Sequence, residues 1–151
     1  DFPDVHLRIA GAGEVTYVTR LHILANELGL QRIHWLGHVA GEYKTALLEQ
    51  AEIFVLPSHS ENFGIAVAEA LAAGQPCIVG KGVALANQIA LAGAGLVVTP
   101  ESDSIAMALS QLLTHHAQRN DMAGHARTLA NEFSVPALGC RLHDLYRSIL
   151  T

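Results

Sequence analysis

The sequence predicts an α/β fold built on a parallel sheet, and two patterns carry this prediction. Short apolar, β-rich runs alternate along the chain with longer segments whose apolar residues recur at helical spacing. Some of these runs are apolar throughout, which is typical of strands covered on both faces. Because right-handed crossovers join parallel strands, we expect a Rossmann-like, doubly wound sheet with helices on both sides.

The expected strands are runs of apolar or β-branched residues that end near a glycine, proline or serine. They cover residues 5–11, 32–37, 53–58, 76–80 and 95–100.

Helices are expected between the strands and after the last one. The first has apolar residues from Val18 to Leu28 at helical spacing, and Gly29 follows as a C-cap. The helix at 63–73 carries a single polar side chain, Glu69, so we expect it to be enclosed on nearly all sides. The remaining helices are expected at residues 41–52, 102–116, 118–133 and 134–150.

Length and charge limit the classes of function. A chain of 151 residues, half of them hydrophobic, suits one compact domain, so residues 1–151 are expected to form a single domain. The formal net charge is −5 and Lys and Arg form no cluster, which argues against nucleic-acid binding. No apolar run reaches the roughly 18 residues of a transmembrane helix, and we expect a cytoplasmic protein.

Neither the cysteines nor the histidines are spaced as metal ligands. Cys77 and Cys140 lie far apart in apolar or helical surroundings, so we expect free thiols in a reducing compartment. The nine histidines show no metal-site pattern with nearby carboxylates. No metal and no cofactor are expected.

Ligands of such sheets bind beyond the carboxyl ends of the strands, where loops lead into helices. The loop at 11–14 contains two glycines, but Thr16 stands where a dinucleotide-binding motif requires a third, so a nicotinamide cofactor is not expected. Whether this turn faces a ligand or only reverses the chain stays open. The other candidate loops are 37–42, 58–62 and 80–86.

The loop at 58–62 is the strongest candidate. It is polar and leads into the helix that we expect to begin near Phe63 and Gly64. The first N–H groups of a helix have no intrahelical partner, and the helix dipole adds about half a positive charge there. A diphosphate would suit this end, and Gly64 would let a ligand approach the backbone closely.

Glu69 is the only charged residue of this helix. A buried carboxylate without a partner is costly, so it must meet a cation, a hydrogen-bond donor or a ligand. Sugar hydroxyls are suitable donors to a carboxylate. From the residues alone, a sugar ligand remains as open as pairing with a basic neighbour or exposure to solvent.

The run S-H-S-E-N-F-G-I-A-V-A-E-A-L-A-A-G-Q-P-C-I, residues 58–78, resembles the E-x7-E motif of retaining GT-B glycosyltransferases, specifically family 4. Other stretches resemble the same domain, from its glycine turn to its closing helices, namely residues 6–14, 35–58, 92–102 and 133–150. The resemblance implies the C-terminal half of a GT-B fold, a nucleotide-sugar-binding domain that works with an N-terminal acceptor domain. The whole enzyme could then be cytoplasmic or peripheral at a membrane.

The resemblance implies roles for two glutamate side chains. Glu61 would contact hydroxyls of the donor sugar near the reacting centre and is the expected catalytic residue. Glu69 would accept hydrogen bonds from the ribose of the nucleotide. The implied reaction transfers a sugar from a UDP-, GDP- or ADP-sugar to an acceptor hydroxyl with retention at the anomeric carbon. It would follow a front-face mechanism rather than use the paired carboxylates of a hydrolase.

Other groups would bind the rest of the donor. The resemblance implies that backbone amides at the start of the helix contact the sugar and the diphosphate, namely those of Asn62, Phe63, Gly64 and Ile65. It also implies that Gly13 in the first loop lies near the phosphates. His38 and Val39 in the second loop would lie against the base.

The chain also departs from the family pattern. The family's donor half usually begins one strand earlier, with an arginine and a lysine that hold the diphosphate, whereas Lys81 follows a different strand. Asn87 and Gln88 stand where proline and glutamate are common. The acceptor domain is absent from this sequence. We therefore expect these residues alone to bind donor weakly and to transfer nothing. An exposed sheet edge or apolar surface would also allow them to self-associate.

Two other classes of function stay open. A sugar-nucleotide epimerase with a related fold would not need the E-x7-E pair, so the motif argues against it. A non-catalytic Rossmann-like module is the other class, and a receiver of that kind would need an acidic pair where the chain has Gly11 and Ala12. The sequence does not identify the donor sugar, the base or the acceptor.

Overall fold

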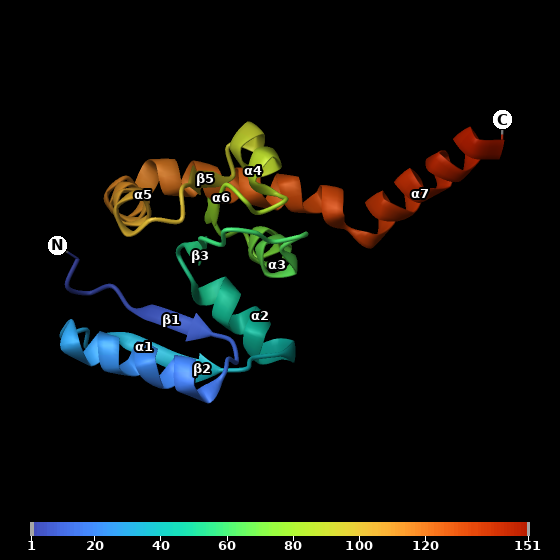
Figure 1. Ribbon diagram of the computed structural model, residues 1–151. Helices are drawn as coiled ribbons and strands as arrows, with labels where there is room; N and C mark the ends of the chain where they lie inside the picture. Colours follow the sequence, from blue (N-terminus) through green and yellow to red (C-terminus); the bar gives the residue numbers. More distant parts are fainter. Residues whose placement is uncertain (1, 151) are drawn as a thin grey trace. The chain divides into compact units, whose positions relative to one another are not determined.

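The computed structural model describes residues 2–150, which form two compact units. The first unit ends at Lys44 and the second begins at Thr45. Strands and helices alternate along the chain as far as the fifth strand, and helices follow it (Figure 1). The predicted α/β class with parallel strands is confirmed. The expectation of a single domain over residues 1–151 stays a prediction.

The first unit contains a two-stranded parallel sheet and the helix that connects its strands. β1 (Leu7–Ala10) pairs with β2 (Ile33–Gly37), and α1 (Val15–Glu27) is the crossover between them. Gly29 has φ +66°, the left-handed conformation that the predicted helix end requires. Among the described residues of this unit only Ala25 is buried, so its apolar core is small.

The second unit contains a three-stranded parallel sheet in the order β3-β4-β5. These strands are β3 (Phe54–Leu56), β4 (Cys77–Gly80) and β5 (Gly95–Val98). Every residue of the central strand β4 is buried, as its apolar sequence predicted.

The strands of residues 2–150 thus pair in two separate sheets rather than in the one sheet that we expected. Apolar strand patterns predict which segments are strands but do not specify which strands are neighbours.

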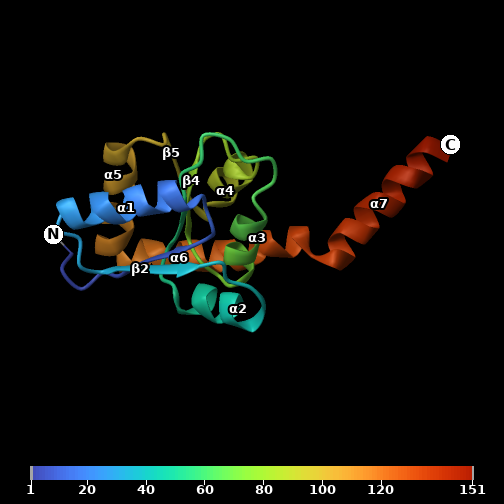
Figure 2. The ribbon, with the colours of Figure 1, turned by 60° about the horizontal axis from the view of Figure 1, so that its bottom comes forward.

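Helices cover both faces of the three-stranded sheet in the second unit. The helices are α2 (Gly41–Gln50), which begins before the unit boundary, α3 (Ile65–Ala72), α4 (Ala86–Ala92), α5 (Ser102–Thr114) and α6 (His116–Ala130). α5 lies on one side of the sheet, and α3 and α4 lie on the other (Figure 2). Cys77 and Val79 of β4 pack with α3, α4 and α6, whereas Ile78 packs with α5 and with Met122 of α6.

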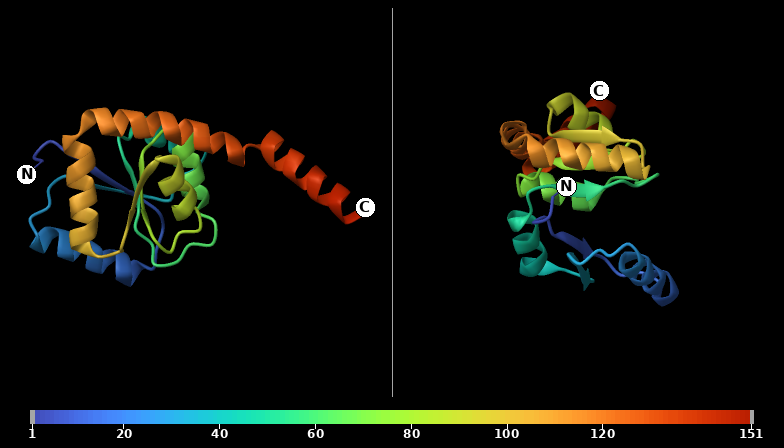
Figure 3. Two further views of the ribbon diagram at one scale, coloured as in Figure 1. Left: turned by 90° about the horizontal axis from the view of Figure 1, so that it is seen from above. Right: turned by 90° about the vertical axis from the view of Figure 1, so that its left-hand side faces the viewer.

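A 3₁₀ turn at Asn131–Phe133 joins α6 to the last helix, α7 (Val135–Leu150). Beyond this turn α7 runs away from the sheet of the second unit (Figure 3), and none of its residues is buried. Among residues 2–150 no helix is both long enough and apolar enough to span a membrane.

α4 was missing from the sequence-based prediction, which placed a candidate loop at residues 80–86 and no helix between that loop and the fifth strand. The signal was present, because Ala86 and Ile89 are three positions apart on the buried side of the helix. Gly93 at φ +65° ends it. Because Gly80 and Gly82 are typical of a loop, the short helix that follows them was not predicted.

Candidate functional site

The predicted site residues fall into two groups, one in each unit. Gly13, His38 and Val39 belong to the first unit. The second unit holds Glu61, Asn62, Phe63, Gly64, Ile65 and Glu69.

In the first unit, β1 and β2 bring the predicted residues to one edge of their sheet. The strands are parallel neighbours, so the loops that follow them lie at the same edge. The N–H of Gly11 donates to the carbonyl oxygen of Gly37 at 2.7 Å and ties the two loops together where they begin. Of the predicted residues on these loops, His38 is exposed and Val39 is half-buried.

The loop that carries Gly13 ends in an acidic residue. Glu14 directly precedes α1, and its carboxylate accepts a hydrogen bond from the Thr16 hydroxyl. A carboxylate at a helix N-terminus already interacts with the helix dipole and repels a second anion. The start of α1 therefore already carries a negative charge of its own.

In the second unit, the loop after β3 and the loop after β4 are hydrogen-bonded to each other. Glu61 forms an isolated parallel bridge with Val83. The Glu61 N–H donates to the carbonyl oxygen of Gly82 at 3.1 Å, and the Ala84 N–H donates to the carbonyl oxygen of Glu61 at 3.0 Å. The main chain of Glu61 is therefore held on both sides.

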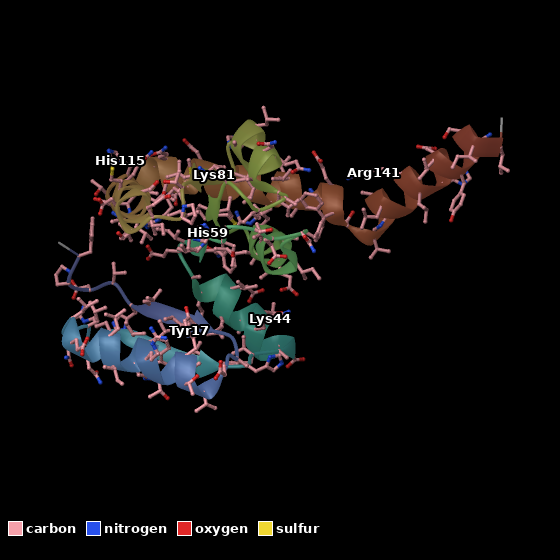
Figure 4. All side chains as sticks on the ribbon, in the orientation of Figure 1. Tyr17, Lys44, His59, Lys81, His115 and Arg141 are labelled. Carbon is pink, nitrogen blue, oxygen red and sulfur yellow. The ribbon has the colours of Figure 1, made fainter. Side chains whose placement is uncertain are left out.

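Two glycines allow these loops to come so close. A Cβ atom on Gly80 would lie 2.2 Å from the carbonyl oxygen of Ser58, and one on Gly82 would lie 1.8 Å from that of His59. No other residue fits at either position without moving the main chain. Figure 4 labels His59 and Lys81, which come from these two loops. Both loops were expected as candidates for ligand binding, but the hydrogen bonds that join them were not predicted.

The side chain of Glu61 is directed toward the start of α3. Its Oε1 atom accepts a hydrogen bond from the N–H of Gly64 at 3.3 Å. Gly64 has φ +81°, a left-handed conformation that favours glycine, and it is the last residue before α3. The half-buried carboxylate thus lies at the positive end of the helix dipole, which stabilises its charge.

α3 differs from its prediction in two respects. It begins at Ile65, just after the expected start near Phe63 and Gly64, because the left-handed Gly64 is outside the helix. It is also not enclosed on nearly all sides, since Val67, Ala70 and Leu71 are buried but the Ile65 side chain is 68% exposed. Hydrophobic residues on both faces hid this asymmetry in the sequence.

Glu69 is half-buried, so it is neither enclosed in the core nor fully exposed to solvent. Of its two neighbours in sequence, Ala68 is half-buried and Ala70 is buried. Glu69 therefore lies at the border of the buried face of α3. At about 1.5 Å of rise per residue, it is about 6 Å along the helix axis from Ile65.

Phe63 fixes the approach to α3 by a contact that the sequence did not predict. Its ring meets that of Phe133 edge-to-face, with centroids 6.0 Å apart and an interplanar angle of 89°. Phe133 belongs to the 3₁₀ turn before α7. Asn62, next to Phe63, is exposed.

The buried cysteine of the central strand is not a nucleophile. Burial of Cys77 raises the pKa of its thiol from 9.0 to about 12, so the thiol is neutral at physiological pH. Cys140 on α7 is an exposed free thiol. Within residues 2–150, no three His, Cys, Asp or Glu side chains are grouped to hold a metal ion.

The chemistry of this edge suits a ligand with both phosphate and hydroxyl groups. Free helical N–H groups follow Gly64 and can bind phosphate oxygens. Glu61 and Glu69 are carboxylates that can accept hydrogen bonds from hydroxyls.

Comparisons with known proteins identify relatives of this chain. A family model described as glycosyl transferases group 1 matches residues 1–129. A D-inositol 3-phosphate glycosyltransferase of Corynebacterium aurimucosum is 30% identical over 155 residues, covering 99% of this chain and 37% of its own length. The D-rhamnosyltransferase WbpZ of Pseudomonas aeruginosa is 36% identical over 130 residues, covering 82% of this chain and 32% of its own. The chain thus spans about a third of the length of these relatives.

Solved structures share the fold. Anabaena Alr3699/HepE in complex with UDP and glucose superposes with a TM-score of 0.85 at 26% identity, over 97% of this chain and 41% of that protein. Sucrose-phosphate synthase from Thermosynechococcus elongatus gives a TM-score of 0.85 at 25% identity, over 98% of this chain and 39% of that protein.

Proposed function

This chain belongs to the glycosyl transferases group 1 family, and we propose from this that it binds the nucleotide diphosphate sugar donor of a GT-B glycosyltransferase. The single observation that carries the proposal is the arrangement around α3. Glu61 is locked against the loop after β4 and directed at the helix start, and Glu69 follows on the same helix. UDP and glucose in a structural neighbour at 26% identity support this choice of ligand class.

In this proposal the donor lies along the start of α3. The N–H groups of Ile65 and Ala66 bind phosphate oxygens in this proposal. They point beyond the N-terminal end of the helix, where the helix dipole favours negative charge. Glu69 accepts hydrogen bonds from the ribose hydroxyls. Gly13, His38 and Val39 meet the phosphates and the base.

Glu61 orients the donor sugar at the reacting carbon. Its carboxylate accepts a hydrogen bond from Gly64 and has further acceptor capacity for a sugar hydroxyl. The anomeric carbon then exchanges its bond to the phosphate oxygen for a bond to the acceptor oxygen and keeps its configuration. The nucleotide diphosphate leaves, and its departing phosphate oxygen takes the proton of the acceptor hydroxyl. The charge that grows on the leaving phosphate is stabilised by amides at the helix start.

The N-terminal acceptor domain of the full-length protein completes the enzyme in this proposal. Membership in this transferase family argues against the epimerase and receiver alternatives. A cytoplasmic location, with or without peripheral membrane attachment, accords with this function.

The test is nucleotide binding by the full-length protein and its Glu69→Ala variant. Isothermal titration calorimetry with UDP, GDP, ADP and their glucose or mannose conjugates should show one preferred base. We expect Glu69→Ala to weaken that binding by about ten- to a hundredfold, because a charged hydrogen-bond acceptor is lost.

Glu49→Ala is the matched control, since Glu49 is an exposed helical glutamate on α2. It should leave the affinity unchanged. Equal affinity of Glu69→Ala and the parent would exclude the ribose role, and no binding of any nucleotide by the parent would exclude the proposed function.

A further inference from the structure

We infer that Lys81 binds an anionic oxygen at the sugar end of the donor, either on the phosphate next to the sugar or on a carboxylate of the sugar itself. This inference rests on the proposed function and adds a specificity-determining residue to its site. Both sources present the same chemistry, an oxyanion within reach of an ammonium group.

The main chain of Lys81 is held in place. It directly follows the buried central strand β4, and its N–H donates to the carbonyl oxygen of Val98 at 3.0 Å. Its neighbours Gly80 and Gly82 are packed against the main chain of Ser58 and His59. The base of the lysine side chain is therefore fixed, while the residue itself is exposed.

The main chain next to Lys81 is hydrogen-bonded to Glu61. The residue after Lys81, Gly82, accepts the hydrogen bond from the Glu61 N–H. Side chains of a strand alternate between faces, so Lys81 continues the face of Cys77 and Val79, which pack with α3 and α4. Lys81 thus lies at the carboxyl edge of the sheet on the α3 side, where α3 begins.

Lys81 is also the one Lys or Arg in the strand-to-helix loops of residues 2–150. Ligands of parallel sheets bind at these loops, so the other cations are placed less favourably. They lie in strands, in helices or in the turn before β2: Arg8, Arg20, Arg32, Lys44, Arg119, Arg127, Arg141 and Arg147.

The charge balance of the site requires a cation. Glu61 places a carboxylate at the helix start, where it repels the phosphate of a donor. Lys81 makes no ion pair within the part of the chain that the structure describes, so its charge is available to a ligand. In this inference the Lys81 ammonium group offsets the repulsion and forms a charge-assisted hydrogen bond to the donor.

The experiment compares Lys81→Met with the full-length parent by calorimetry. The probes are UDP, UDP-glucose and UDP-glucuronate, or the guanine or adenine equivalents if the parent selects that base. Lys44→Met is the matched control, since Lys44 is the other lysine of the sequence and lies in α2. Thermal unfolding checks that each variant is folded, and Lys81→Arg should retain most of the affinity.

A loss of about ten- to a hundredfold for all three probes assigns Lys81 to the phosphate. A loss of the same size for the glucuronate conjugate alone assigns it to a sugar carboxylate. Unchanged affinity for every probe overturns the inference but leaves the proposed function intact. If the parent binds no nucleotide at all, both fail together.

Discussion

Glu61 is tied to its surroundings by both main chain and side chain. Its N–H and carbonyl groups bond to the loop after β4, and its carboxylate accepts from Gly64. Replacing Glu61 by glutamine preserves size and one acceptor oxygen but removes the charge. The change therefore tests the role of the charge without opening the loop contact.

We predict that Glu61→Gln in the full-length enzyme lowers the turnover rate by about a hundredfold or more, a size typical of a lost electrostatic group at a reacting centre. The affinity for the nucleotide diphosphate should change less than about threefold, because that part of the donor is bound by other groups. Steady-state transfer assays and calorimetry give the two quantities. Equal turnover rates for variant and parent would contradict the catalytic role.

At the residue scale, sequence reasoning selected the glutamates but not their environments. Spacing and a family resemblance selected Glu61 and Glu69 as the expected site residues. The half-burial of Glu69 and the bond from Gly64 to Glu61 depend on contacts made after folding. Lys81 was not selected from the sequence, because it follows a different strand from the one that carries the diphosphate-binding pair in the family.

At the scale of elements, the contact between the loops after β3 and β4 is the feature that builds the site. Gly82 has no room for a side chain, since a Cβ atom would lie 1.8 Å from the carbonyl oxygen of His59. We predict that Gly82→Ala destabilises the protein by about 3 kcal/mol, the upper range for overpacking, because main chain must move. Urea denaturation measures the change in the free energy of unfolding.

Gly124→Ala on α6 is the control for this prediction. Nothing lies within 4 Å of a Cβ atom at that position. Alanine should therefore stabilise the helix by about 0.5–1 kcal/mol through its higher helix propensity. If both substitutions have similar effects, the loop contact is not the cause of any loss at Gly82.

The positions of the strands were predicted well because each strand is a short apolar run bounded by turn residues. Such runs are too short to form helices. α4 was missed because it is short and follows two glycines that resemble a loop. The start of α3 was placed too early because helix propensity cannot reveal the left-handed Gly64. Local patterns therefore give the order of elements, but tertiary contacts set their ends.

At the scale of the whole molecule, the pairing of strands is the property that the sequence did not specify. The alternation of strands and helices predicts that the strands are parallel. It does not predict which strands pair with each other, since pairing depends on residues far apart in the chain. The consequence is two units with unequal cores. In the first only Ala25 is buried among the described residues, whereas the second buries the whole of β4 and parts of α3, α4 and α6.

Unequal cores imply unequal local stability. We predict that the amides of β1 and β2 exchange hydrogen at least about a hundredfold faster than those of β4 and β5, after correction for intrinsic rates. A sheet of two strands with one helix buries too little apolar surface to resist opening. Opening β4, by contrast, requires disruption of the main core. Hydrogen exchange of this chain, followed by mass spectrometry or NMR, measures the difference. Equal protection of both sheets would show that the two units unfold in a single cooperative step.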